Sequence, residues 1–168
     1  MGFFLKGGKH IMNQEETKLL YGRVGMIVAL SQMVEYNLAE IQAYCKALSN
    51  LNEGQVQPDR QKQILMEADD IYHANLAKTL GQNIQGIKDS CIFEDDPKFI
   101  DSLGGVLKER NYVVHQLFKD DVQKQYIQNN LQRVLDRLSN AVGRLNNLNK
   151  KLIEIIVDLD QQLSSTAK

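Results

Sequence analysis

Residues 15–49 read EETKLLYGRVGMIVALSQMVEYNLAEIQAYCKALS, and this stretch decides the fold class. Its apolar side chains recur at spacings of three and four residues, which is typical of an amphipathic α-helix. The residues that form the pattern are Leu19, Leu20, Val24, Ile27, Val28, Met33, Val34, Leu38, Ile41, Tyr44 and Leu48. Gly22 and Gly25 weaken the early turns, and residues 50–54 supply a stop. We therefore predict a long first helix.

Two weaker patterns follow. From Pro58 to Gly81, apolar residues again recur at helical spacing, and a terminal glycine is typical of a helix end. This segment predicts a second helix. Residues 82–90 fit either a short helix or a loop.

The last 72 positions predict two more helices. A third helix over 97–118 follows acidic residues 94–96, whose carboxylates suit the exposed N–H groups of a first turn. A fourth helix begins at Asp120 and extends to about Leu163, carried by a leucine repeat. Its length exceeds the usual globular helix, so a break near Gly143 or at residues 146–149 is an alternative.

The composition supports an all-α fold. The chain has 168 residues, of which 43% are hydrophobic and 24% charged, and only two prolines, as expected for one domain rich in helix formers. We predict an antiparallel four- to five-helix up-and-down bundle over residues 14–168. Residues 1–13 are predicted to be a flexible leader or a vector-derived remnant.

Charge and cysteine content narrow the function classes. A net charge of −1 gives no global field for gathering nucleic acid, so such contact requires a local basic surface. Cys45 and Cys91 belong to no CxxC pair, which predicts free thiols in a reducing compartment. No stretch approaches the roughly 20 apolar residues of a membrane span, so we expect a cytoplasmic protein without membrane contact.

One position on the predicted third helix breaks its apolar stripe. The stripe consists of Leu103, Val106, Leu107, Val113, Val114 and Leu117. Arg110 occupies the gap, and a desolvated guanidinium requires pairing and hydrogen bonds. Arg110 is therefore expected to meet a carboxylate, border a cleft or face an anion, with Glu35 as a candidate carboxylate.

Asn111 and His115 are spaced at i and i+4, so they project from nearly the same side of a helix. Arg110 lies roughly 140° around the axis from His115, given 3.6 residues per turn. The three side chains converge in one chain only through the reach of arginine. A second subunit would remove this difficulty.

The segment Arg110-Asn111-x-x-x-His115 resembles the motif of the HEPN family, small helical bundles whose ribonuclease members carry an arginine, a polar residue and a histidine on a late helix. The resemblance extends loosely over the first helix, from residues 22–24 to residues 35–38. It implies a dimer that cleaves RNA without a metal or other cofactor, in a cleft between protomers.

The resemblance also implies roles for the three residues. His115 would act as general acid or base, since imidazole titrates near neutrality. Arg110 would bind the scissile phosphate and offset its growing charge. Asn111 would orient the phosphate or the imidazole. Such a protein would be the toxin of a toxin–antitoxin or defence system, with an antitoxin or another protein as partner.

The chain departs from one variant of the family. HEPN toxins that are silenced by nucleotide transfer carry a tyrosine two residues after the histidine, where this chain has Leu117. That mode of control is not carried over.

Other interpretations stay open. A non-catalytic HEPN-like module would dimerise and bind a protein partner or nucleotide, and a plain scaffold would use Arg110 only as a structural ion pair. Asp69, Asp70 and His73 have a spacing that metals use, but they are too few to close a site and predict an exposed salt bridge instead.

Overall fold

The computed structural model describes residues 12–52, 57–90, 93 and 96–166, and within them every regular element is an α-helix. The all-α prediction is confirmed. The helices are α1 (Gln14–Leu51), α2 (Pro58–Leu76), α3 (Leu80–Asp89), α4 (Pro97–His115), α5 (Asp121–Asn129) and α6 (Leu131–Thr166). In this part of the chain, no helix combines the length and apolar character that a membrane span requires.

Helix α1 begins with a capping box. The side chain of Asn13 accepts a hydrogen bond from the Glu16 backbone N–H at 2.9 Å, and Glu16 accepts one from the Asn13 N–H at 2.8 Å. Two donors at the start of the helix are satisfied in this way. Met12 packs against the core, so the last two residues of the predicted leader belong to the bundle. Residues 1–11, and Cys91, lie outside the described residues.

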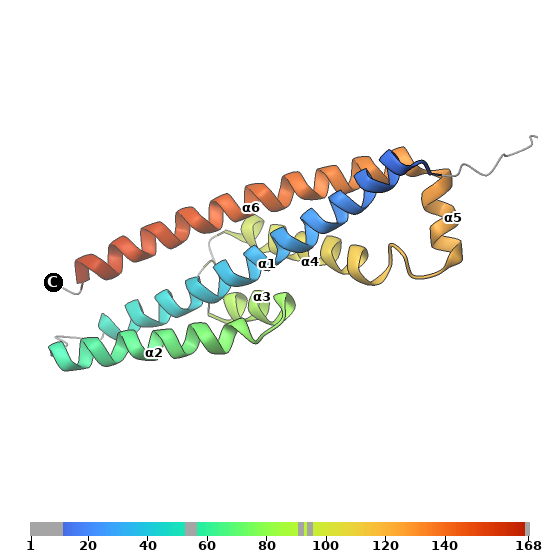
Figure 1. Ribbon diagram of the computed structural model, residues 1–168. Helices are drawn as coiled ribbons and strands as arrows, with labels where there is room; N and C mark the ends of the chain where they lie inside the picture. The colour runs from blue at the N-terminus through green and yellow to red at the C-terminus, as the bar shows by residue number, and fades with distance from the viewer. Residues whose placement is uncertain (1–11, 53–56, 91–92, 94–95, 167–168) are drawn as a thin grey trace, which may run out of the picture.

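The two longest helices, α1 and α6, form the main pair and run in the same direction (Figure 1). Helix α2 returns along the second half of α1, and α4 runs back toward its first half. Helices α2 and α4 therefore both run opposite to α1 and α6, and the short α3 between them reverses the chain (Figure 1). The α1 and α6 pair is parallel because α5 crosses the end of the bundle and lets α6 start beside the start of α1 (Figure 1).

The main core lies between α1, α4 and α6, with α3 contributing at one side. Its side chains are almost completely buried, so the removal of apolar surface from water is the main contribution to the stability of the fold. Among them are Leu20, Ile27, Val34 and Leu38 of α1, Ile84 and Ile87 of α3, Phe99, Leu103 and Val113 of α4, and Leu138, Leu145 and Leu152 of α6. This core fixes the side of α4 on which its polar residues remain.

The predicted fourth helix consists of two helices, α5 and α6, and the leucine repeat does not predict where they separate. The break falls at Asn130, between α5 and α6, whereas Gly143 and residues 146–149 lie inside a continuous α6. The Asn130 side chain donates to the Tyr126 carbonyl oxygen at 3.0 Å and so competes with helix continuation. The stretch 82–90, left open above, belongs mostly to α3, which starts with a capping box at Thr79.

A buried asparagine sets the alignment of α1 and α6. Asn149 accepts a hydrogen bond from the Asn37 amide and donates one to the Leu30 carbonyl oxygen, both at 3.0 Å. Its side chain is 3% exposed, so these bonds are protected from water. A shift of one helix along the other would break both bonds.

We expect Asn149→Ala to lower the free energy of unfolding by about 1–3 kcal/mol, because the substitution removes the partner of the half-buried Asn37 amide and the buried bond to the Leu30 carbonyl oxygen. Asn146→Ala, an exposed change on the same helix, is the matched control and should stay within about 0.5 kcal/mol of the unchanged protein. Urea titration followed by circular dichroism measures both. Equal effects would show that the buried pairing contributes nothing.

Candidate functional site

Helix α4 places the Arg110-Asn111-x-x-x-His115 motif in its last two turns. The helix begins at a proline with Asp96 as the cap, whose carboxylate accepts from the Phe99 N–H at 3.0 Å. It ends at His115. Because Val106 and Val113 are buried in the core, the motif residues lie along the flanks and outer side of α4.

Arg110 is half-buried and has no carboxylate within ion-pair distance among residues 12–52, 57–90, 93 and 96–166. Its guanidinium donates to the Asn111 side-chain oxygen at 3.2 Å. Glu35, the candidate carboxylate from the sequence, forms no ion pair with Arg110 within the described residues. Glu35 instead accepts from the Leu80 N–H at 2.9 Å, so its carboxylate serves the first turn of α3.

The acidic neighbour of Arg110 also points elsewhere. Glu109, only 19% exposed, bonds to Arg137 at 3.3 Å and to Arg144 at 3.1 Å, both on α6. Successive residues of a helix project about 100° apart, so Glu109 and Arg110 serve opposite flanks of α4. The cation is therefore left available to a ligand.

His115 is exposed, and its side chain makes no hydrogen bond with any part of the chain that the structure describes. It shares the outer side of α4 with Asn111, as the spacing predicts, and the side chain of Val114 beside it is 45% exposed. One chain thus brings Arg110 and Asn111 into contact but leaves the imidazole unoriented.

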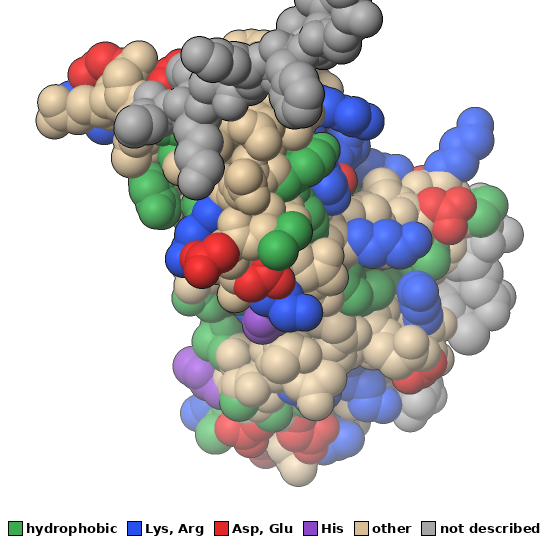
Figure 2. Space-filling model, turned by 90° about the vertical axis from the view of Figure 1, so that its right-hand side faces the viewer, with side chains coloured by type: hydrophobic (Ala, Val, Ile, Leu, Met, Phe, Trp, Pro, Cys, Tyr) green, Lys and Arg blue, Asp and Glu red, His purple; other side chains and the backbone are tan. Residues whose placement is uncertain are grey.

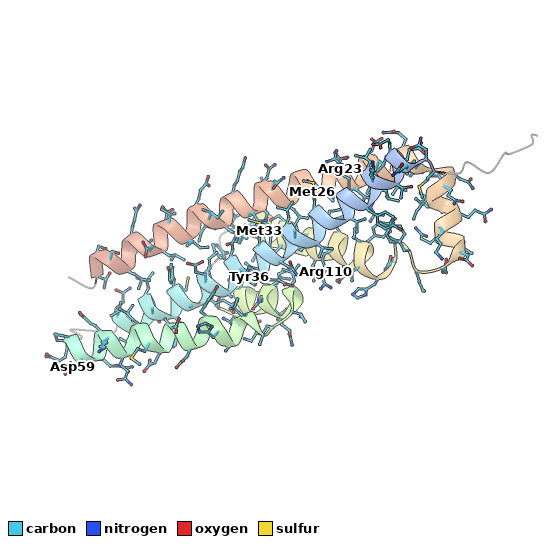
Figure 3. All side chains as sticks on the ribbon, viewed as in Figure 1. Arg23, Met26, Met33, Tyr36, Asp59 and Arg110 are labelled. Carbon is cyan, nitrogen blue, oxygen red and sulfur yellow. The ribbon has the colours of Figure 1, made fainter. Side chains whose placement is uncertain are left out.

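An apolar stripe on α1 was missed in the sequence. Leu19 and Met33 were assigned to the core-facing pattern, yet they are 46% and 44% exposed. With Met26 they recur every seven residues, and Gly22, Ala29 and Tyr36 recur at the same interval. We call these six residues the α1 stripe. All six are exposed, and Met26, Met33 and Tyr36 follow one another along α1 with Arg110 on the neighbouring α4 (Figure 3).

The α1 stripe lacks charge. None of the exposed residues of α1 from Leu19 to Tyr36 is Asp, Glu, Lys, Arg or His, and Arg23 and Glu35 are half-buried beside the stripe. A seven-residue repeat of apolar and small side chains is the signature of a helix that packs against another helix. Spacing alone does not separate this repeat from the core pattern, because the buried residues Leu20, Ile27 and Val34 also recur every seven residues.

A cavity of 360 Å³ lies on the other flank of the motif. It is lined by Tyr112, Gln123, Tyr126, Arg133, Val134 and Arg137, from α4, α5 and α6. The Arg137 guanidinium sits 3.6 Å from the centre of the Tyr112 ring, a cation–π contact. Figure 2 views this end of the molecule and shows Lys and Arg side chains gathered on its right-hand side.

The remaining candidates are ordinary surface or core groups. His73 and Asp69 form an exposed i, i+4 pair at 3.6 Å, and the described residues contain no group of three or more metal-ligating side chains. Burial raises the pKa of the Cys45 thiol to about 11, so it stays protonated at neutral pH and is a poor nucleophile.

We expect Arg110→Leu to leave stability within about 1 kcal/mol of the unchanged protein or to raise it, because no carboxylate loses its partner and the stripe of α4 gains an apolar side chain. Thermal unfolding followed by circular dichroism tests this. A loss of more than about 2 kcal/mol would mean that Arg110 is a structural residue.

Comparisons with protein-family models, with curated proteins and with solved structures find no match to this chain.

Proposed function

We propose that the protein is a metal-independent endoribonuclease of the HEPN type that acts as a homodimer through Arg110, Asn111 and His115. The observation that carries this proposal is the state of Arg110. A half-buried guanidinium with no carboxylate partner among the described residues is suited to an anion, and a phosphodiester is the anion that the neighbouring amide and imidazole could process.

The α1 stripe supports the dimer. Exposed Leu19, Met26 and Met33 are costly to leave in water, and small Gly22 and Ala29 allow the axis of a second helix to come close. Because α1 packs beside α4, a second copy seated on this stripe would lie next to the motif. Arg110 of one protomer could then complement His115 of the other.

The proposed cleavage of the phosphodiester requires no metal or cofactor. The ribose 2′-oxygen forms a bond to phosphorus and the bond from phosphorus to the 5′-oxygen breaks, leaving a 2′,3′-cyclic phosphate and a 5′-hydroxyl. A neutral imidazole accepts the 2′-hydroxyl proton, and an imidazolium donates a proton to the leaving oxygen. Arg110 offsets the charge that builds on the phosphate, and Asn111 holds the guanidinium in place.

The test is incubation of the purified protein with mixed RNA, including transfer RNA, in the presence of a chelator. Cleavage that leaves cyclic-phosphate ends supports the proposal. Absence of cleavage by a folded dimer would overturn it.

A second candidate is a non-catalytic HEPN-like module that dimerises and binds a protein partner or a nucleotide. The exposed, unoriented His115 favours this reading, because a general acid or base is usually fixed by a hydrogen bond. The module would keep its partner after His115→Ala. The first proposal includes a toxin role, which is tested by toxicity on expression, and an antitoxin partner, which is tested by co-purification. It also includes a cytoplasmic location.

A further inference from the structure

The cavity between α4, α5 and α6 is built from residue types that bind nucleotides. Its 360 Å³ fall within the range of about 300–1,000 Å³ typical of small-ligand sites. Two of its six lining residues are arginines and two are tyrosines. Tyrosine rings stack on bases of any sequence, and guanidinium groups bind phosphate oxygens in pairs of hydrogen bonds.

The charge of this cavity is positive. None of the six lining residues is acidic. Arg133 is exposed and has no carboxylate partner in the described part of the chain, and Arg137 shares the single carboxylate of Glu109 with Arg144. This leaves an excess of cationic groups at the cavity, in a protein whose net charge is −1.

The nearby carboxylates are already engaged. Asp120 accepts from the Gln123 N–H at 2.8 Å, and Asp121 pairs with Lys124 at 3.0 Å. Asp136 accepts from the Gln132 side chain at 2.8 Å. Because none of these three acids pairs with Arg133, its guanidinium stays open to an incoming anion.

The cavity lies next to the motif. Tyr112 belongs to the motif segment itself and is three residues before His115, so the two side chains are neighbours on the surface of α4. Arg137 covers one face of the Tyr112 ring, whereas Tyr126 contributes the second ring from α5. A single-stranded nucleic acid bound at His115 would therefore reach the cavity with its neighbouring nucleotide.

We propose that this cavity holds one nucleotide of a single-stranded RNA, with its base on Tyr126 and its phosphate on Arg133. The inference rests on the proposed function in taking RNA as the ligand. It assigns the cavity a positioning role, in which the nucleotide beside the scissile phosphate is held while Arg110, Asn111 and His115 act.

The test measures binding apart from cleavage. The probe is a fluorescein-labelled single-stranded oligonucleotide of mixed sequence in which every 2′-hydroxyl is methylated, so it cannot be cleaved. Fluorescence anisotropy gives its Kd for the unchanged protein and for variants, at several salt concentrations. RNA cleavage is measured with the same preparations.

We expect Arg133→Gln to weaken binding about tenfold and to reduce the slope of log K against log salt by about one, as loss of one phosphate contact does. Tyr126→Leu should weaken binding about tenfold with the slope unchanged, because stacking is not electrostatic. The matched control is Lys150→Gln, which removes a positive charge from an exposed residue of the same helix that does not line the cavity, and its Kd should change less than twofold.

The outcomes separate the two proposals. If the protein cleaves RNA but Arg133→Gln and Tyr126→Leu bind the probe unchanged, the cavity assignment is wrong and the enzyme stands. If these variants lose affinity but no RNA is cleaved, the nucleotide site stands and the ribonuclease does not. Equal losses in Arg133→Gln and Lys150→Gln, or no binding of the probe by the unchanged protein, would also overturn the cavity assignment.

Discussion

His115→Ala is expected to lower the rate of RNA cleavage by at least about 100-fold while leaving the fold and the dimer unchanged. A positioned general acid or base contributes about 10²–10⁴ to the rate, and a dimeric site would lose both of its imidazoles at once. Because the His115 side chain is exposed and makes no hydrogen bond within the described residues, its removal disturbs no packing. Gel analysis of labelled RNA in chelator gives the rates.

His73→Ala is the matched control for this experiment. His73 is also an exposed histidine near the end of a helix, but it lies on α2 and pairs with Asp69. Its removal should leave cleavage unchanged. If both variants cleave as fast as the unchanged protein, His115 is not catalytic, and any activity in the preparation comes from another group or a contaminant.

Met26→Glu is expected to dissociate the dimer and, with it, to abolish cleavage. Met26 lies in the middle of the α1 stripe, so a pairing of two copies would bury two carboxylates near each other. Each unpaired buried charge costs several kcal/mol, enough to weaken dimerisation by more than about 100-fold. Sedimentation velocity over a range of concentrations measures the change.

Met66→Glu on α2 provides the control, because Met66 is even more exposed, at 62%, and lies outside the stripe. It should leave both the dimer and the rate intact. A dimer that persists in Met26→Glu would place the interface elsewhere. A protein that is monomeric before any substitution would remove the composite site from the proposal.

Much of the fold follows from local sequence signals. The helix that decides the fold was predicted as residues 15–49 and is found as Gln14–Leu51. The agreement is close because apolar spacing and helix caps depend on residues near one another in the sequence. The break at Asn130 escaped prediction. An asparagine bond to a carbonyl is available at many positions, and the packing of α5 across the bundle end decides where it forms.

The candidate site was predicted in composition but not in geometry. Residues four positions apart lie on the same side of any α-helix, so the shared side of Asn111 and His115 could be predicted from the sequence. The bond of Glu35 to α3 could not, since it depends on how separate segments pack. Exposure of Leu19 and Met33 was also beyond a search for apolar spacing alone, because α1 has apolar residues on more than one side.

The parallel pairing of α1 with α6 has a consequence for how the protein is made. The hydrogen bonds of Asn149 that align the two helices join residues 112 and 119 positions apart. Helix α1 therefore cannot pack against α6 until most of the residues between them have been translated. Contacts this distant slow folding and leave apolar surface exposed on the growing chain. A nascent chain on the ribosome would therefore hold α4 against α1 and α3 but without α6, and the proposed RNA cleavage would begin only after α6 has emerged.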